Sequence, residues 1–390
     1  MRISKLRLVV NIMKIGINTR FLLSHKMEGF GWFTFETMKR IVRKHPKHQF
    51  VFFFDRPFDP KFIFASNVTP VVLNPPARHP ILFKIWFNYS ITRALKKHKC
   101  DAFISPDGYL SLRTNVPQLS VIHDLNFEHH PEDIPKNALN YLKKYFPKFA
   151  HKAKRICTVS NYSKQDIIET YGVNPNKVDV TFNGVAEIFK PLLPQEQKKV
   201  RVKFSQGKPY ILFVGAIHKR KNLNRLIQAF VRLKEETSLP HQLLIVGEPM
   251  WNSEKVKIPP SLKSHVSFTG HLPLETLAQV MASADVFAFV SYFEGFGIPL
   301  VEAMKCGTPT LAGNRTSLPE IGGDAVLYCD PFDVDDIFQK LLSMLEDEGL
   351  RQLLSHKGIE RAQSFSWDST AATLWTAFEK MMSLQIKNSQ

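Results

Sequence analysis

Short runs of apolar residues alternate with longer amphipathic segments along the whole chain. In the first half the apolar runs are KIGIN, QFVFFF, AFISP, QLSVIH and ICTVS. The second half repeats the theme with PYILFVG, QLLIVG, VSFTG, VFAFV, TPTLA and AVLYC, separated by helical patterns such as NLNRLIQAFVRLKEE and LETLAQVMASA. Almost wholly apolar strands are typical of parallel sheets that are covered on both faces. The pattern therefore predicts an α/β fold with two doubly wound, Rossmann-like domains.

The alternation lapses once, around residues 187–208, where prolines and a run of charged residues stand between two periodic regions. We expect an interdomain linker at 191–207, with a first domain over 1–190 and a second over 208–366. Residues 367–390 predict a C-terminal helix. Its apolar side, with Trp367, Trp375 and Phe378, would cross back to cover the first domain.

The charge of the chain is concentrated in its first half. The 390 residues include 52 Lys and Arg against 35 Asp and Glu, a net charge of +17, and residues 1–195 hold 30 of the basic and 14 of the acidic ones. Such a field steers anionic partners to the first domain. Anionic lipid, a phosphate-bearing acceptor and nucleic acid are the partners with the required charge.

One basic stretch carries no acidic residue between Asp133 and Asp166, and its lysines are interleaved with tyrosines and phenylalanines. One interpretation is a basic, aromatic helix that lies on an anionic lipid surface. The other is an ordinary surface helix whose aromatic stripe faces the core. The sequence supports both equally.

No apolar run approaches the roughly 18 residues of a membrane span. The start, MRISKLRLVVNI, is too short in its apolar part for a signal peptide, so we interpret residues 1–12 as an extension or a mis-called start. The widely spaced cysteines fit buried small hydrophobes in a reducing, cytoplasmic setting; they are Cys100, Cys157, Cys306 and Cys329.

The segment EGFGIPLVEAMKCGTP, residues 294–309, follows a predicted strand and contains two glutamates, Glu294 and Glu302. Glycines let a backbone approach a ligand closely, and a helix N-terminus offers free N–H groups to a phosphate. Carboxylates accept hydrogen bonds from the vicinal hydroxyls of a sugar or ribose. A tight strand-to-helix turn is the structural alternative. The ligand-binding candidates are Glu294, Gly295, Phe296, Gly297, Ile298 and Glu302.

A second segment, VGAIHKRKNLNRLI, leaves a strand at Gly215, and Asn222 is placed to cap the next helix. Arg220 and Lys221 then lie at the N-terminal end of that helix, where cations oppose the dipole and a bound anion would explain them. A solvated basic loop is the alternative. In doubly wound sheets ligands bind at the carboxyl ends of strands, so both segments should border one crevice.

Together these segments resemble family 4 of the glycosyltransferases, the "glycosyl transferases group 1" family, whose GT-B fold has two Rossmann-like domains facing across a cleft. Glu294, the following GFG and Glu302 match the family's paired glutamates, and Lys221 matches its donor-phosphate lysine. LPEIGGDAVLYCDP and TVSNYSKQDIIETYGVNPNKVDVTFNGV also resemble family segments. The resemblance covers roughly residues 14–380.

Two features of the first domain resemble the family as well. MEGFGWFTFETM is similar to its glycine-containing loop, in which Gly29 and Gly31 would open a helix that faces the crevice. His123 matches a histidine that lies near the donor sugar, with Asp124 beside it on the acceptor side. One position departs from the family: Ala216 follows Gly215 where many members have arginine, and we assign that charge to Arg220.

The resemblance implies a retaining hexosyltransferase that attacks from the front face without a protein nucleophile. Lys221 and Arg220 would stabilise the leaving diphosphate, Glu302 would hold the ribose, and Glu294 with His123 would hold the hexose. GDP-mannose is the favoured donor, and a glycan or lipid-linked acceptor of a bacterial surface glycan is expected, with no nucleic-acid partner. We expect a cytoplasmic protein, peripheral to the inner membrane.

No metal ion or other cofactor is expected. The only Asp-x-Asp spacing, in DPFDVDD at 330–336, fits a turn and a helix cap, and no His cluster has metal-ligand spacing. Two other classes of function remain open. One is a sugar-nucleotide epimerase or hydrolase of the same fold; the other is a non-enzymatic basic protein that binds membrane or nucleic acid, which would leave the paired glutamates unexplained.

Overall fold

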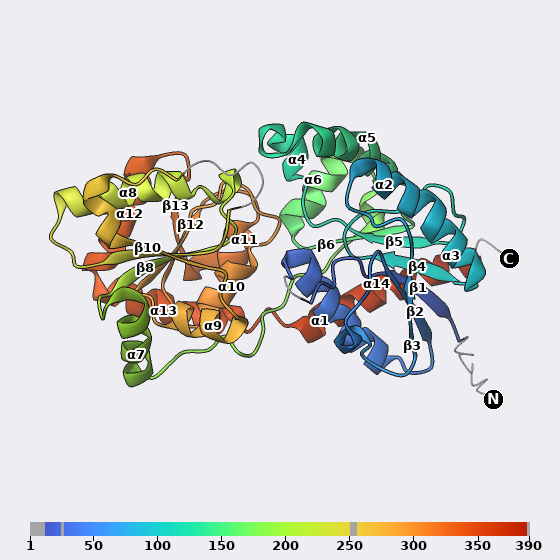
Figure 1. Ribbon diagram of the computed structural model, residues 1–390, viewed down its shortest axis with the longest axis horizontal. Helices are drawn as coiled ribbons and strands as arrows, with labels where there is room; N and C mark the ends of the chain where they lie inside the picture. The colour runs from blue at the N-terminus through green and yellow to red at the C-terminus, as the bar shows by residue number, and fades with distance from the viewer. Residues whose placement is uncertain (1–11, 25–26, 250–255, 388–390) are drawn as a thin grey trace, which may run out of the picture. The chain divides into compact units, whose positions relative to one another are not determined.

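The computed structural model describes residues 12–24, 27–249 and 256–387 (Figure 1). These residues contain two sheets, one of seven strands and one of six. The α/β class with two parallel-sheet, Rossmann-like domains is therefore confirmed. The segment that we interpreted as an extension or mis-called start lies almost entirely in residues 1–11, outside the described residues.

The N-terminal half contains the five predicted strands in order and two further strands, at 68–72 and 178–180. The elements of this half are β1 (Lys14–Asn18), α1 (Gly29–Lys44), β2 (Gln49–Phe54), β3 (Val68–Val72), α2 (Pro80–Ile85), the π-helical turn η2 (Trp86–Ile91), α3 (Thr92–Lys97), β4 (Ala102–Ser105), β5 (Gln118–Val121), α4 (Asn126–His129), α5 (Lys136–Lys152), β6 (Arg155–Thr158), α6 (Asn161–Tyr171) and β7 (Val178–Val180).

The C-terminal half repeats the alternation. Its elements are α7 (Pro194–Ser205), β8 (Tyr210–Val214), the 3₁₀ turn η5 (Lys219–Lys221), α8 (Leu223–Glu236), β9 (Gln242–Val246), β10 (Val266–Gly270), α9 (Leu274–Ala282), β11 (Val286–Phe289), α10 (Ile298–Lys305), β12 (Thr310–Gly313), α11 (Leu318–Gly322), β13 (Leu327–Cys329), α12 (Val334–Glu346), α13 (Glu348–Ala362) and α14 (Trp367–Lys387).

Both sheets reverse their strand order at one point. The first has the order β3-β2-β1-β4-β5-β6-β7 and the second the order β10-β9-β8-β11-β12-β13. In the first sheet the chain adds β2 and β3 on one side of β1 and then returns to add β4 on the other side. In the second sheet it adds β9 and β10 on one side of β8 and then returns to add β11 on the other side. Ligands of doubly wound sheets bind at the carboxyl ends of the strands on either side of such a switch point. The two switch points lie between β1 and β4 and between β8 and β11.

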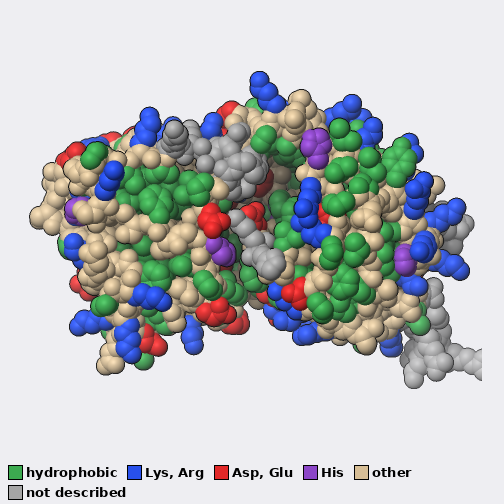
Figure 2. All heavy atoms as spheres, in the orientation of Figure 1, with side chains coloured by type: hydrophobic (Ala, Val, Ile, Leu, Met, Phe, Trp, Pro, Cys, Tyr) green, Lys and Arg blue, Asp and Glu red, His purple; other side chains and the backbone are tan. Residues whose placement is uncertain are grey.

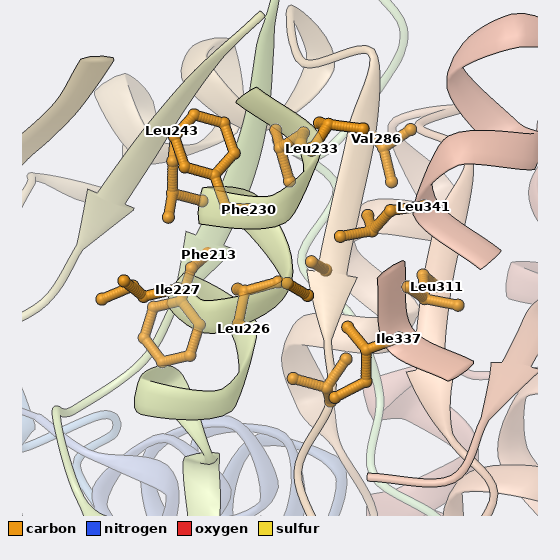
Figure 3. Close-up of a cluster of buried hydrophobic side chains, with 14 of the residues drawn as sticks. Phe213, Leu226, Ile227, Phe230, Leu233, Leu243, Val286, Leu311, Ile337 and Leu341 are labelled. Carbon is orange, nitrogen blue, oxygen red and sulfur yellow. The ribbon is translucent and has the colours of Figure 1, made fainter. Parts of the chain in front are cut away.

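The core of the second sheet shows why its helices form where they do. Helix α8 buries residues spaced three or four apart, the spacing of one helical face. Figure 3 shows these side chains packed against the strands and against Ile337 and Leu341 of α12. The buried residues of α8 are Leu223, Leu226, Ile227, Ala229, Phe230 and Leu233.

The chain forms two compact units whose boundaries differ from the predicted domains. The first unit contains residues 1–122, 144–157 and 371–390, and the second contains 123–143 and 158–370. The predicted first domain, 1–190, is thus divided. Hydrogen bonds within the second unit accompany this division: the backbone N–H groups of Asn161 and Tyr162 donate to the carboxylate of Glu320, at 2.8 and 3.0 Å.

Most of the expected linker, 191–207, is helix α7 instead. Pro194 occupies its first turn, and the Glu196 carboxylate accepts a hydrogen bond from the Leu193 N–H at 3.0 Å. Arg201 anchors the helix by donating to the Ser283 carbonyl and the Asp285 carboxylate. No pattern in the sequence indicated this helix, because α7 is polar on nearly every side, with only Val200 and Ser205 buried, and so lacks an apolar stripe. In the first unit, Trp375 of α14 stacks on His45 with ring centroids 3.8 Å apart.

The acid-free stretch forms α5. Its aromatic residues Tyr141, Phe146 and Phe149 are buried, whereas Lys144 and Lys148 are exposed. The core-facing interpretation therefore holds for the aromatic stripe, and the lysines remain on the surface. Figure 2 shows Lys and Arg side chains spread over the visible face of the protein. No helix in the described part of the chain is long and apolar enough to span a membrane.

Two predictions about minor features can be compared with the structure. All four cysteines are buried and unbonded to one another, as expected for small hydrophobes. Asp333 caps α12 by accepting hydrogen bonds from the N–H groups of Asp335 and Asp336, so the Asp-x-Asp spacing has the predicted structural role.

Candidate functional site at the second switch point

Glu294 lies in the loop that follows β11, and its backbone is fixed on both sides. The Glu294 N–H donates to the Thr316 hydroxyl at 3.0 Å, and the Ser317 hydroxyl donates to the Glu294 carbonyl at 2.9 Å. Only 5% of Glu294 is exposed. The loop therefore holds this carboxylate in one position at the switch point.

Two cations from the loop after β8 meet this carboxylate. Lys221 Nζ lies 2.6 Å from Glu294 Oε1, and Arg220 Nη1 lies 2.7 Å from Glu294 Oε2. Burial alone would raise the pKa of Glu294, but the two cations outweigh burial and hold that pKa at about 2. Burial lowers the pKa of Lys221, and Glu294 opposes this effect. The expected meeting of both loops at one edge of the sheet is thus observed.

The turn η5 that carries Arg220 and Lys221 is shaped by its neighbours. The ring of His218 caps it through Nδ1, which accepts from the Arg220 N–H at 3.4 Å. Asn222 adopts a left-handed conformation with φ 62° and does not cap α8 through its side chain, which corrects the prediction. Its amide donates instead to the carbonyls of Val290 and Pro331, because the turn brings it over the neighbouring strand ends.

The glycine-rich loop brings a first-half segment against the site. A Cβ on Gly295 would lie 2.3 Å from the His123 carbonyl oxygen and 2.9 Å from the Asp124 Cβ. The Ser160 hydroxyl also donates to the Gly295 carbonyl at 2.7 Å. Asp124 lies close enough to help raise the pKa of Arg220, together with Glu294. That the His123 side chain borders the same site stays a prediction.

The rest of the loop begins helix α10. Gly297 is its N-cap residue, with φ 92°, a conformation that favours glycine. Pro299 occupies the first turn as predicted. The ring of Phe296 is buried against Phe365, with centroids 5.5 Å apart, so this side chain anchors the loop. Ile298 is half-buried.

Glu302 differs from Glu294 in having no partner. Its side chain is half-buried in the second turn of α10, and it makes no hydrogen bond or ion pair to any residue that the structure describes. Burial raises its pKa to about 8. An unpaired carboxyl in such surroundings is prepared to accept hydrogen bonds from a ligand.

Gly29 and Gly31 belong to the first unit and lie at the start of α1. A Cβ on Gly31 would lie 2.7 Å from the Phe21 carbonyl oxygen, whereas a Cβ on Gly29 would meet nothing within 4 Å. Close packing therefore requires glycine at 31 and not at 29. That the two glycines border the same crevice as Glu294 stays a prediction.

Sequence reasoning missed the hydroxyl residues that fix the loop: Ser160, Ser163, Thr316 and Ser317. Ser160 has a weak signal, since it follows a strand and caps α6. No sequence signal points to Thr316. Its backbone is left-handed, with φ 56°, and threonine rarely adopts this conformation, so residue type gives no hint of it. Among the described residues, no group of three or more His, Cys, Asp or Glu side chains is placed to hold a metal ion.

Comparison with known proteins identifies the family of this chain. The model "Glycosyl transferases group 1" matches residues 194–361, and the model "Glycosyltransferase Family 4" matches residues 27–187. O-antigen chain mannosyltransferase B of Escherichia coli is 32% identical over 292 residues, which cover 73% of this chain and 76% of the relative.

Solved structures with little sequence identity share the fold. HepE of Anabaena in complex with UDP-glucose matches with a TM-score of 0.71 at 17% identity, covering 95% of this chain and 100% of that one. WaaG, a glycosyltransferase involved in lipopolysaccharide biosynthesis, matches with a TM-score of 0.72 at 16% identity, covering 92% and 97%. These matches confirm the predicted GT-B class.

Proposed function

This chain belongs to the group 1 glycosyl transferases of family 4, and on that premise we propose which reaction its site performs. The protein moves a hexose from a nucleotide-diphosphate sugar to a glycan or lipid-linked acceptor, with retention of configuration and without a metal ion. The observation that supports this proposal is the cluster of Arg220, Lys221 and Glu294 at the switch point, in the loops that lead into η5 and α10.

The two cations have donors to spare for a diphosphate. An ammonium carries three N–H donors and a guanidinium five. Lys221 uses one donor on Glu294, and Arg220 uses Nη1 on Glu294 and on the Phe293 carbonyl. The leaving diphosphate gains charge as the glycosidic bond breaks. Fixed cations at that position stabilise the transition state more than the ground state.

Glu294 is suited to hold a sugar hydroxyl and not to donate a proton. With a pKa of about 2 it is ionised at neutral pH, so it accepts hydrogen bonds only. His123 lies on the segment that packs against Gly295, which supports a place for it near the same hexose. Neither role requires a covalent bond to the protein, in agreement with front-face attack.

Glu302 is assigned to the ribose. Its carboxyl has no partner within residues 12–24, 27–249 and 256–387, and the two vicinal hydroxyls of a ribose supply two donors. The N-terminus of α10 follows the same loop, with Gly297 as its N-cap residue, and offers backbone N–H groups to the nucleotide. The nucleotide would thus be held at one end by the helix and at the other by the cations.

Mannose is the favoured hexose and GDP the favoured nucleotide. The support for mannose is the relative named O-antigen chain mannosyltransferase B. A bacterial surface glycan then follows as the acceptor class. The exposed lysines of α5 support a peripheral position on the cytoplasmic face of an anionic membrane.

A thermal-stabilisation screen of nucleotide sugars identifies the donor, and NMR of the product reads the anomeric configuration. GDP-mannose should stabilise most, and transfer should require an added glycan. Turnover of donor alone at the full rate would show a hydrolase or epimerase. Failure of GDP and UDP to bind in a calorimetric titration would leave a basic binding protein.

A further inference from the structure

The first sheet carries its own charged pair at its switch point. Arg20 follows β1 and Asp107 follows β4, and these two strands are hydrogen-bonded neighbours. Arg20 Nε lies 2.6 Å from Asp107 Oδ2, and the two side chains are 5% and 2% exposed. Ligands of doubly wound sheets bind at this edge, so a buried pair here requires an explanation.

Asp107 is fixed before any ligand arrives. Its Oδ1 accepts hydrogen bonds from Asn18 Nδ2 at 2.8 Å and from the Ser105 hydroxyl at 3.0 Å. The backbone N–H of Tyr109 also donates to Oδ1, at 3.3 Å. Because Oδ2 remains for Arg20, the carboxylate sets the plane of the guanidinium.

Aromatic rings surround the guanidinium. Arg20 Cζ lies 4.4 Å from the ring centroid of Tyr109, 4.5 Å from Phe21, 5.0 Å from Phe83 and 5.5 Å from Phe87. Phe87 is buried, whereas the other three residues are half-buried. The pair therefore lies beneath an aromatic rim that solvent reaches.

The guanidinium keeps unused donors. Asp107 accepts from Nε, and the Tyr109 hydroxyl lies beside the guanidinium as a further acceptor. A guanidinium has five N–H groups, and no other acceptor for them is found in the described ranges. The Arg20 side chain is 5% exposed, so a ligand hydroxyl can replace water at these donors.

We propose that Arg20 and its aromatic rim bind one neutral hexose residue of the acceptor glycan. The hydroxyls of the hexose accept from the free N–H groups, and its apolar face packs on the half-buried rings. Because Asp107 already offsets the charge of Arg20, a neutral sugar fits better than a phosphorylated one. The inference rests on the proposed function, which supplies the need for a glycan acceptor.

The test is calorimetric titration of the full chain with methyl α-mannotrioside and, separately, with methyl α-mannoside 6-phosphate. The parent should bind the neutral trioside and should not prefer the phosphate. Arg20→Lys keeps the charge and loses the planar fork, so the affinity for the trioside should fall at least about tenfold. Phe83→Leu should lower it about threefold to tenfold.

Matched variants outside the site should bind the trioside as the parent does. Arg43→Lys changes an arginine that donates to the Phe64 carbonyl, and Phe58→Leu changes a half-buried ring stacked on Phe54. GDP affinity should stay unchanged in all four variants. If Arg20→Lys does not fold, the affinity of Phe83→Leu for the trioside decides whether the proposal stands.

The proposal is overturned if the parent does not bind the trioside, if it prefers the phosphate, or if Arg20→Lys and Phe83→Leu bind like the parent. Loss of GDP binding in the same variants would also overturn it, since the effect would then be on the whole fold. Failure of the parent to bind GDP or UDP refutes the proposed function instead, and the trioside titration still reports on Arg20.

Discussion

The two sheets have the same topology around their switch points, yet the walls of the two sites differ. In the second unit Lys221 and Arg220 meet Glu294 in the loop that leads to the N-terminus of α10. In the first unit Arg20 meets Asp107 among aromatic rings. Backbone amides and cations suit a diphosphate, and ring faces suit a sugar. On the two proposals above, the same edge of each sheet would bind a different kind of ligand, because the residues after β1 and β8 differ.

Removing Lys221 should have the largest effect on turnover, and it should show whether the cations of the second unit take part in the reaction. Lys221→Ala should lower turnover about a hundredfold to a thousandfold, since a cation that stabilises the leaving diphosphate is lost. The fold should persist because Arg220 still pairs with Glu294. Steady-state kinetics with the donor found in the screen gives the measurement, and Lys219→Ala, in the same turn, serves as the control. Parent-like turnover in both variants would remove Lys221 from the reaction.

A glycine-to-alanine substitution in each unit tests where close packing requires glycine. Gly295→Ala should destabilise the protein by about 1–3 kcal/mol, because its Cβ would overlap the His123 carbonyl. Gly29→Ala meets nothing within 4 Å and should leave stability unchanged or raise it by about 0.4–1 kcal/mol through the unfolded chain. Thermal unfolding of both variants is the measurement. Equal effects would mean that the loop at Gly295 relaxes freely.

Glu302 should make nucleotide binding depend on pH. A ribose binds the ionised carboxylate, and the pKa of about 8 means that the ligand-free protein must first release a proton below that pH. GDP affinity should therefore rise by up to about tenfold per unit as the pH rises towards 8, and then level off. Glu302→Gln should flatten this profile. A parent profile that is already flat between pH 6 and 8 would contradict the assignment.

The same raised pKa has a consequence for the ligand-free fold. Because folding raises the pKa of Glu302 from its ordinary 4.5, its contribution to stability is complete below that pH and is lost as the pH rises through 8. Melting temperatures of the parent and of Glu302→Gln should therefore diverge towards higher pH, with Glu302→Gln the more stable.

Vesicle binding tests whether the basic first half meets a membrane. The chain should co-sediment with anionic vesicles and not with neutral ones, and less so in high salt, because each exposed lysine near the surface contributes about 1 kcal/mol. Lys144→Glu and Lys148→Glu on α5 should each weaken the binding. Equal binding to both vesicle types would refute the electrostatic interpretation.

Chelation should have the smallest effect. Turnover in excess EDTA should equal turnover without it, since Lys221 and Arg220 are proposed to take the part of a metal ion. Complete loss of activity that manganese or magnesium restores would show that the cations do not suffice.

The sequence predicted the strands better than the connections. Long apolar runs such as QFVFFF are strands in the structure, but β3 was missed because Pro70 interrupts it, and β7 because it has three residues. The candidate loops at 215–222 and 294–302 were recognised from residue type. The pairing of Lys221 with Glu294, and the approach of His123 to Gly295, depend on contacts between distant segments that no local pattern encodes.

The hydrogen bonds of the Glu320 carboxylate limit where this protein can be joined to a relative in a chimera. It accepts from Asn161 and Tyr162 at the start of α6, so a residue of the C-terminal half completes a helix of the N-terminal half. A chimera joined near residue 190 would inherit these partners from two parents. Hybrid proteins should therefore be built by transplanting 123–143 and 158–187 together with the C-terminal half.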